Sequence, residues 1–220
     1  MITTNNSVKL VGHYGSDETH ACSAWVSTGS QFLDEIEPKT GEPRRNRIPA
    51  MLSSLASAGH HTPFEKSSLH FVVTAEIASH IHLLKHRIGV SINGESARYK
   101  ELPEDRFYIP NDWPAFEQEY LRSHCLRCFQ NYHAAIERFV GGGMDRKRAK
   151  ESARFYLPYA TQIQFDVMFN WRSFYHFLSL RNSPKAQLEI REIAAEMLRL
   201  VSEIEGSPFK WTIAAFDLIP

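Results

Sequence analysis

Cations, hydroxyls and an amide are concentrated in the stretch KHRIGVSINGESARYKE, residues 85–101. Three basic side chains, Lys85, His86 and Arg87, are followed by a run of Gly, Ser and Asn residues. This combination is typical of phosphate binding, because cations pair with the charge and a backbone of small residues can approach the oxygens closely. The stretch has neither P-loop nor GxGxxG spacing. It predicts a local anion site, with a solvated helix end and a polar turn as the alternative.

A second candidate cation is Arg154, in the segment MDRKRAKESARFYLP. Because Phe155, Tyr156 and Leu157 follow it directly, we expect its side chain to be partly buried and to need an anionic partner. Glu151 lies three residues earlier on the same predicted helix face and is the alternative to a ligand anion.

A third group of polar side chains alternates with aromatic ones in FNWRSFYHFLSLRNSP. One predicted helix face carries an amide, two aromatic rings and a guanidinium at i, i+4, i+7 and i+11: Asn170, Phe174, Phe177 and Arg181. Arg172 and His176 share another face. An amide and a guanidinium among aromatic rings suit a planar heterocycle, which the guanidinium can stack on or donate to. An aromatic core with arginines at the surface is the competing interpretation.

Composition excludes several classes of protein. The chain has 220 residues, 43% of them hydrophobic, and its 25 basic side chains balance 25 acidic ones. It can bury a sizeable core, but it has no global field that would attract nucleic acid or an anionic membrane. The N-terminal MITTNNSVKL lacks a signal pattern, and no apolar run approaches the roughly 20 residues of a membrane span. We expect a cytoplasmic protein without a membrane or nucleic-acid partner.

Cysteines and histidines do not predict a metal site. The three cysteines, Cys22, Cys125 and Cys128, are too few for a disulfide framework. The C-x-x-C pair lies in a stretch of helical periodicity, and no second pair completes a zinc site, so we interpret these residues as structural thiols. The 11 histidines include no HxxxH with a supporting carboxylate at a familiar spacing. A metal-dependent hydrolase is therefore a weak rival.

The elements that must position these residues are both strands and helices, which predicts an α+β fold. VKLVGHYG near the N-terminus and residues 67–75 read as strands, and residues 46–59 as a helix ended by a glycine. A long helix should end at the glycines of residues 141–143, with Asp145 capping the next one. Ser183 and Pro184 predict the start of a final amphipathic helix, stopped by Gly206. Its inward face is Ile190, Ile193, Met197, Val201 and Ile204.

A further stripe predicts that the cationic motif lies on a helix. Ile77, Ile81, Leu84 and Ile88 fall at i, i+4, i+7 and i+11. If they face the core, one flank carries the basic residues at positions 82, 85 and 86 and the other carries position 87. The following GVSINGESARY is expected to be a loop.

Taken together, the segments resemble one family, the flavin-dependent thymidylate synthases. The family signature, R-H-R followed by S-x-R, is similar to KHR at residues 85–87 and SAR at residues 96–98. GHHTPFEK, RFYIP, ARFYLP and NWRSFYHFLSLRNSPKAQLEIRE resemble further family elements in the expected order. The resemblance covers about residues 23–216. It implies a single catalytic domain over residues 1–220, with a mixed or antiparallel sheet and long helices.

The resemblance also implies a reaction and an assembly. Enzymes of this family convert dUMP to dTMP with methylene-tetrahydrofolate as carbon donor, FAD as hydride carrier and NADPH as reductant. They are homotetramers whose active sites are shared between subunits. The alternative from another class is a non-enzymatic nucleotide or single-stranded nucleic-acid binder, which would use the same cations and aromatic rings but no flavin.

Site residues follow from the resemblance position by position. The implied FAD-binding residues are Thr62, Glu65, Lys85, His86, Arg87, Glu95, Asn170, Arg172 and His176. The implied dUMP-binding residues are His82, Lys85, Glu95, Ser96, Ala97, Arg98, Arg154 and Arg181. Arg181 is the implied catalytic residue, whose guanidinium would polarise the uracil ring and stabilise charge that develops at N3.

Three features bear on this assignment. Lys85 stands where the family usually has Arg, and an ammonium cannot make the bidentate contact of a guanidinium. The interval between Arg87 and Ser96 is one residue longer than the common spacing. Ser96 could also be read as a covalent nucleophile, but no base and carboxylate form a recognisable triad with it, so we assign it a binding role.

Overall fold

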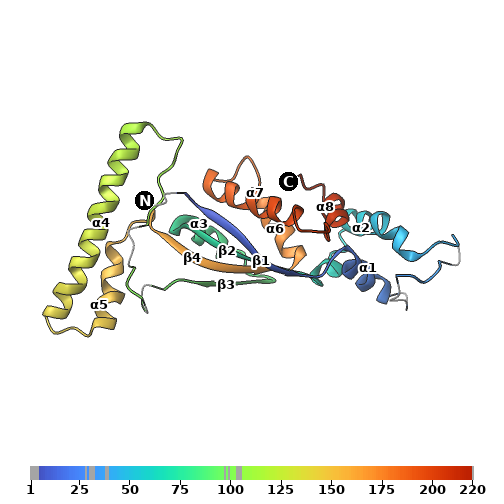
Figure 1. Ribbon diagram of the computed structural model, residues 1–220, viewed down its shortest axis with the longest axis horizontal. Helices are drawn as coiled ribbons and strands as arrows, with labels where there is room; N and C mark the ends of the chain where they lie inside the picture. The colour runs from blue at the N-terminus through green and yellow to red at the C-terminus, as the bar shows by residue number, and fades with distance from the viewer. Residues whose placement is uncertain are drawn as a thin grey trace. The chain divides into compact units, whose positions relative to one another are not determined.

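The structure is a computed structural model that describes residues 5–27, 29, 33–37, 40–96, 98, 100–102 and 106–219. In these ranges four strands form one sheet in the order β1-β2-β4-β3. The strands are β1 (Ser7–Tyr14), β2 (Ser68–Glu76), β3 (Val90–Gly94) and β4 (Gln162–Phe169). The α-helices are α1 (Asp17–Val26), α2 (Ile48–Ser57), α3 (Ile77–Leu83), α4 (Ala115–Gly141), α5 (Arg146–Ala153), α6 (Trp171–Arg181), α7 (Leu188–Ser202) and α8 (Lys210–Ala215). The predicted α+β class is confirmed (Figure 1).

The strands run antiparallel to their neighbours. On β4 and β3, Asn170 N donates to Gly89 O at 3.2 Å and Glu95 N donates to Gln164 O at 2.8 Å, so one strand rises in number as the other falls. Alternating burial on β2 places Leu69, Phe71 and Val73 in the core, as its period-two pattern predicts. The other face of β2 is half-buried.

Contacts between residues divide the chain into two compact units. Unit 1 contains the chain up to Ser7, Val73–Lys85 and Asn93–Phe165. Unit 2 contains Val8–Val72, His86–Ile92 and Asp166–Pro220. A single catalytic domain stays a prediction, and each unit is described by itself below.

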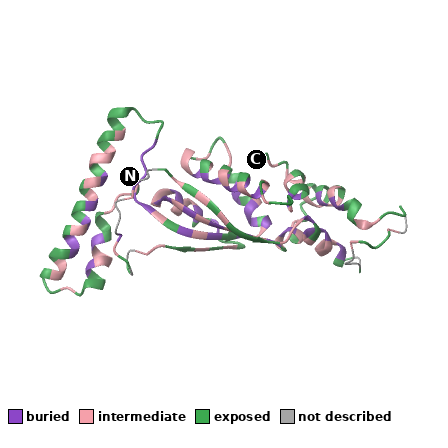
Figure 2. Ribbon diagram, viewed as in Figure 1, coloured by how far each residue is buried: buried purple, intermediate pink, exposed green. Residues whose placement is uncertain are grey.

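The core of unit 1 lies between the long helix α4, its neighbour α5 and the segment before α4. Fully buried Phe129 and Tyr132 of α4 pack with Phe107, and the Tyr132 hydroxyl accepts a hydrogen bond from Leu102 N at 3.2 Å. The two helices lie side by side in Figure 1, and Figure 2 shows exposed and half-buried residues along the remainder of their surfaces. The glycine stop after α4 is confirmed, and Asp145 caps α5 through its carboxylate, which accepts from Arg148 N.

The core of unit 2 is rich in aromatic rings that α6 contributes. Phe174 stacks on Phe71 with ring centroids 5.7 Å apart, and Phe177 contacts Phe169 at 5.3 Å. Trp171 stacks on Phe209 at 5.2 Å, so the segment before α8 also packs against α6. These rings hold α6 rigidly in the unit, which matters because α6 carries several predicted site residues.

A buried polar chain ties α1 to α8 and to the residue before β2. Thr212 Oγ1 donates to Asp17 Oδ1 at 2.5 Å and lies 3.0 Å from His20 Nδ1, while Ser67 Oγ lies 2.9 Å from His20 Nε2. Because Thr212 uses its proton on the carboxylate, His20 must carry its own proton on Nδ1 and accept from Ser67. Burial lowers the pKa of His20 to about 4, so the ring is neutral. Its edge contacts Phe64, which lies in the 3-10 turn η2 (Thr62–Glu65).

The prediction of a helix that carries the cationic motif is wrong. Helix α3 ends at Leu83, and the exposed fractions of Leu84 and Ile88 are 44% and 90%. Gly89, with φ of +66°, turns the chain directly after the motif. A strand, β3, then replaces the first part of the expected loop because its backbone pairs with β4.

The predicted start of the final helix is also wrong. Ser183 forms a turn in which its carbonyl accepts from Ala186 N, and α7 begins only at Leu188. The inward face is confirmed: Ile190, Ile193, Met197 and Val201 are buried, whereas Ile204 is half-buried beyond the end of the helix. Among the described residues, no helix is long and apolar enough to cross a membrane.

Candidate functional site

The cationic motif follows α3 as a short irregular segment, and the N-terminus of α6 holds its end. Ser173 Oγ donates to Ile88 O at 2.6 Å, and Asn170 N donates to Gly89 O at 3.2 Å. Asn170 also caps α6, because its Oδ1 accepts from Ser173 N at 2.8 Å. A Cβ atom at Gly89 would lie 2.5 Å from Asn170 Nδ2 and closer still to Ser173 Oγ. Only glycine therefore fits between the motif and α6.

The C-terminal end of the same helix contacts the middle of the motif. Arg181 Nε donates to His86 Nε2 at 3.1 Å. His86 is 8% exposed, and its ring packs edge-on against Phe177 at 5.1 Å and against His176 at 6.0 Å. Arg87, in contrast, is exposed. The structure therefore brings His86, His176 and Arg181 together, three residues from two distant parts of the sequence.

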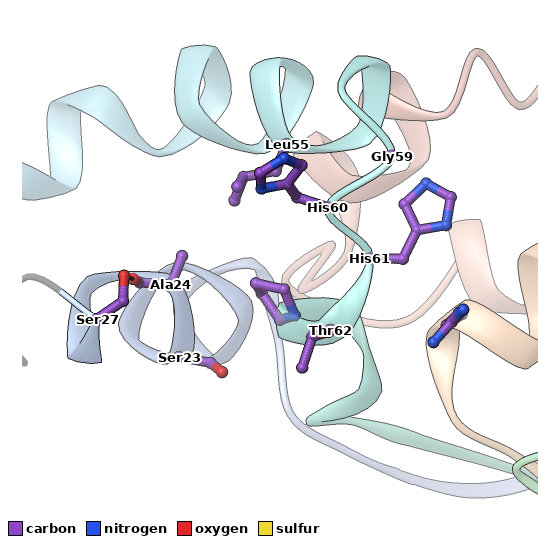
Figure 3. A pocket seen from close by; sticks show the side chains of 10 residues that line it. Ser23, Ala24, Ser27, Leu55, Gly59, His60, His61 and Thr62 are labelled. Carbon is purple, nitrogen blue, oxygen red and sulfur yellow. Dashed lines mark hydrogen bonds between the residues drawn. The ribbon is translucent and has the colours of Figure 1, made fainter.

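A cleft in unit 2 brings together another part of the predicted site. It has a volume of about 490 Å³ and is lined by Ser23, Ala24, Ser27, Leu55, Gly59, His60, His61, Thr62, Pro63 and Arg172. Figure 3 shows Ser23 on α1, Ser27 just after its end, and Thr62 on the turn that follows α2. Arg172 Nη1 lies 2.5 Å from Glu65 Oε1, so the cleft's guanidinium is held by a predicted site carboxylate.

Sequence reasoning did not single out the two histidines or Ser23 as lining residues. His61 packs against Phe64, Tyr175 and Phe216, so one of the two histidines serves as an aromatic packing residue. Their place in GHHTPFEK, beside Thr62, is the signal that pointed to this turn. Ser173 was missed as well. Its role depends on a contact with Ile88, which lies 85 residues away.

In unit 1, Glu95 is the centre of an ion-pair cluster. Its carboxylate lies 3.0 Å from Lys100 Nζ and 2.9 Å from Arg106 Nη2, and it accepts from Gln164 N at 3.2 Å. Burial would raise the pKa of Glu95, but the hydrogen bonds from Lys100 and Gln164 and the charge of Arg106 lower it below its ordinary value. The carboxylate is therefore ionised, and it holds the end of β3 against the segment that follows.

The signature serine and arginine lie just beyond this cluster. Ser96 is half-buried, and its Oγ accepts from Arg98 N at 3.3 Å. The Arg98 guanidinium lies 3.0 Å from Glu151 Oε1, and this hydrogen bond is the main cause that lowers the pKa of Glu151. Ala97 lies outside the described residues.

The expectation that Arg154 is partly buried is wrong, and the alternative in which Glu151 is its partner is wrong as well. Arg154 is exposed in the turn η3 (Arg154–Tyr156), and its guanidinium lies 5.9 Å from the ring of Phe155. Glu151 instead pairs with Arg98 and Arg148. Both carboxylate oxygens of Glu151 are taken by these two partners, Oε1 by Arg98 and Oε2 by Arg148.

His82 and Lys85 complete the predicted residues of unit 1. Lys85 is exposed after the end of α3. His82 is half-buried, and its Nδ1 atom is buried without a hydrogen-bond partner among the described residues. Buried polar atoms nearly always have a partner. The ring of His82 therefore has hydrogen-bonding capacity that no described residue uses.

The chain is similar to known proteins over most of its length. A sequence profile of the family described as "Thymidylate synthase complementing protein" matches residues 9–205. The "Flavin-dependent thymidylate synthase" of Pseudothermotoga lettingae is 30% identical over 95% of this chain and 89% of its own length. The protein of the same description from Geobacter sulfurreducens is 32% identical over 86% of this chain and 79% of its own.

Solved structures point in the same direction. A UMP/dUMP methylase, PolB from Streptomyces cacaoi, bound with 5-Br UMP has a TM-score of 0.76 and 25% identity, covering 99% of this chain and 98% of its own. The same enzyme bound with 5-Br dUMP has a TM-score of 0.78 and 27% identity, covering 97% and 95%. With the profile match over most of its length, the chain belongs to the flavin-dependent thymidylate synthase family, as its motifs predicted.

Proposed function

We propose that this protein is a flavin-dependent thymidylate synthase that methylates dUMP at C5 to form dTMP, with methylene-tetrahydrofolate as carbon donor and NADPH as reductant. The observation that carries the proposal is the family match over residues 9–205, a range that contains the signature-like residues 85–87 and 96–98. The structural neighbour PolB, bound with 5-Br dUMP, supports the nucleotide. The chain is accordingly a methyltransferase.

The residues of unit 2 fit a flavin nucleotide. The cleft of about 490 Å³ is of the size that binds nucleotide-like ligands. It offers hydroxyl and guanidinium donors, Thr62 and Arg172, and the guanidinium is held by Glu65. As the family resemblance implies, we also assign FAD binding to the three motif residues, to the N-cap and one residue of α6, and to Glu95: Lys85, His86, Arg87, Asn170, His176 and Glu95. Bound there, FAD would supply the two-electron reduction that the chemistry needs.

The residues of unit 1 fit a nucleoside monophosphate. Arg98 and Arg154 are exposed cationic side chains, and Ser96, two residues before Arg98, offers a hydroxyl group. His82 has a buried ring nitrogen that lacks a partner among the described residues. We assign the phosphate and sugar of dUMP to these residues and to Ala97 and Lys85. Glu95 is assigned to orienting this segment, through the ion pairs described above.

Arg181 carries the catalytic role in this proposal. Its fixed guanidinium would donate to the uracil ring and stabilise negative charge at N3 and the adjacent carbonyl oxygens as C5 forms its new bond to carbon. The proton at C5 is then lost, and the transferred carbon is reduced to a methyl group. Because this stabilisation acts on charge that develops only during the reaction, its loss should lower kcat more than it raises KM.

The test is turnover with an omission series. Purified protein is incubated with dUMP, methylene-tetrahydrofolate, FAD and NADPH, and nucleotides are separated by chromatography. We expect dTMP in the complete mixture. We expect none when the folate is omitted, and none when FAD is omitted from a reaction with protein from which the flavin has been removed. Formation of dTMP without FAD, or none in the complete mixture with flavin-loaded protein, would overturn the proposal.

UMP is a second candidate substrate, because the structural neighbour is a UMP/dUMP methylase observed with analogues of both nucleotides. The same assay with UMP in place of dUMP decides between strict and relaxed use of the sugar. Assembly as a homotetramer with shared active sites and a cytoplasmic location stay predictions. Sedimentation velocity tests the first of them.

A further inference from the structure

Both ends of α6 contact the four-residue segment from His86 to Gly89. At the N-terminal end, Ser173 and Asn170 bond to the carbonyl groups of Ile88 and Gly89. At the C-terminal end, Arg181 reaches His86. Because α6 is held in the aromatic core, the backbone that carries His86 and the backbone that carries Arg181 have fixed relative positions.

The contact between Arg181 and His86 specifies the protonation of the imidazole. Arg181 Nε carries a hydrogen at any accessible pH, so it can only donate. His86 Nε2 must therefore present its lone pair, and the ring is neutral with its hydrogen on Nδ1. The ring is 8% exposed and packs on Phe177, which fixes its plane.

The same contact fixes the orientation of the guanidinium. A guanidinium has five N–H donors in one plane, and the one on Nε is used by His86. No other described residue hydrogen-bonds to Arg181, whose two terminal Nη groups are left to donate end-on. An end-on pair of donors matches adjacent acceptors on a planar heterocycle such as the uracil ring.

We propose that His86 is a positioning residue for Arg181: its neutral imidazole holds the guanidinium so that both Nη groups face the uracil, and protonation of His86 releases Arg181. The inference rests on the proposed function of Arg181. It is separate from the flavin-binding role that the family resemblance implies for His86.

Protonation would reverse the contact because two N–H groups would then face each other. The titratable side chains of α6 that contact the His86 ring are Arg181 and His176. Lys85 and Arg87 flank it in its own segment. All four are basic side chains, and those that are charged disfavour a positive charge on the imidazole. We therefore expect activity to fall on the acid side as His86 gains a proton.

Two substitutions distinguish the role of His86 as a hydrogen-bond acceptor from the effect of its protonation. His86→Gln keeps an acceptor oxygen near the position of Nε2 but cannot be protonated in this range, whereas His86→Phe keeps a flat ring without an acceptor. With FAD saturating in every reaction, we expect His86→Phe to lower kcat by about 10- to 100-fold, the range of a hydrogen bond to a charged group. We expect His86→Gln to retain most of kcat and to lose the acid limb of the pH profile. The control His124→Gln, an exposed histidine on α4, should keep both.

A double substitution tests whether His86 affects kcat through Arg181. If His86 acts through Arg181, then His86→Phe should cause little further loss of kcat in an Arg181→Lys background. Equal losses in both backgrounds would overturn the proposal. So would an unchanged acid limb in His86→Gln.

A spectroscopic readout does not depend on turnover. In ligand-free protein with ¹⁵N-labelled histidine, the ring signals that disappear in His86→Gln should show a protonated Nδ1 and an unprotonated, hydrogen-bonded Nε2. Arg181→Lys should shift that Nε2 signal. A hydrogen on Nε2, or no response to Arg181→Lys, would refute the positioning role even in an active enzyme. The expected spectrum in a protein that forms no dTMP would instead refute the proposed function and leave the contact intact.

Discussion

Substitution of Gly89 by alanine tests whether the motif depends on close approach to α6. Gly89 has φ of +66°, where an L-residue is strained. The added Cβ would lie 2.5 Å from Asn170 Nδ2 and closer to Ser173 Oγ. Neither side chain can rotate away freely, because Asn170 caps α6 and Ser173 holds the carbonyl of Ile88.

The expected loss is the sum of three effects. Left-handed backbone for alanine costs about 1 kcal/mol. Loss of the Ser173 hydrogen bond costs about 1 kcal/mol, and disturbance of the Asn170 cap costs about 1 kcal/mol. The free energy of unfolding, measured by urea titration followed by circular dichroism, should fall by about 3 kcal/mol. FAD affinity should fall as well, because the segment that carries His86 is displaced.

Gly41 provides a matched control. Its φ is +71°, but a Cβ there has nothing within 4 Å, so Gly41→Ala isolates the backbone strain from the close contact. It should lose about 1 kcal/mol. If Gly89→Ala loses no more than Gly41→Ala and binds FAD normally, the close approach of the motif to α6 does not support the site.

Three further predictions concern unit 2. Thr212→Val leaves Asp17 without a hydroxyl donor and should lower the free energy of unfolding by about 1 to 3 kcal/mol, whereas Thr212→Ser should restore most of it; equal losses in the two variants would contradict the hydrogen-bond assignment. Burial lowers the pKa of His20 from its ordinary value of 6.5 to about 4 in the folded protein, so the unfolded chain binds the proton first and stability falls as the pH drops from 6.5 towards 4. Between pH 7 and 5 the wild type should lose about 2 kcal/mol more than His20→Gln in urea unfolding, and parallel losses would refute this. Arg172→Lys should weaken FAD binding by about 10-fold or more, because an ammonium group lacks the planar set of N–H donors of a guanidinium. It should change the free energy of unfolding by less than about 1 kcal/mol, because the ion pair of Arg172 with Glu65 is half-exposed. An unchanged FAD affinity in a fluorescence titration would show that Arg172 is not part of the FAD site.

Sequence patterns predicted those elements whose burial follows one regular period. The alternating residues of β2 and the inward face of α7 are both in the core, and the glycines after α4 end that helix. Sequence patterns gave wrong predictions where a tertiary contact decides the conformation. Leu84 and Ile88 continue the helical spacing of apolar residues in the sequence. The helix nevertheless ends at Leu83, because Gly89 has a positive φ and its carbonyl accepts a hydrogen bond from the N-cap of α6.

The site shows the same division. Residue types and order identified the family and singled out Arg181 and His86 separately, since each belongs to a motif. Their contact across 95 positions has no local signal in the sequence. Helix spacing likewise offered Arg154 as a partner of Glu151, whereas the carboxylate pairs with Arg98, which lies 53 positions away and has no local signal in the sequence.

A visible absorption spectrum can establish whether this chain binds a flavin and whether dUMP binds close enough to change the flavin's absorption. The protein is purified without added cofactor, incubated with FAD, desalted, and titrated with dUMP. We expect a retained flavin spectrum that shifts with dUMP and saturates, and a shift that is weaker in Arg181→Ala. Protein that retains no flavin after incubation, or a flavin spectrum that does not respond to dUMP, would contradict the proposed synthase function.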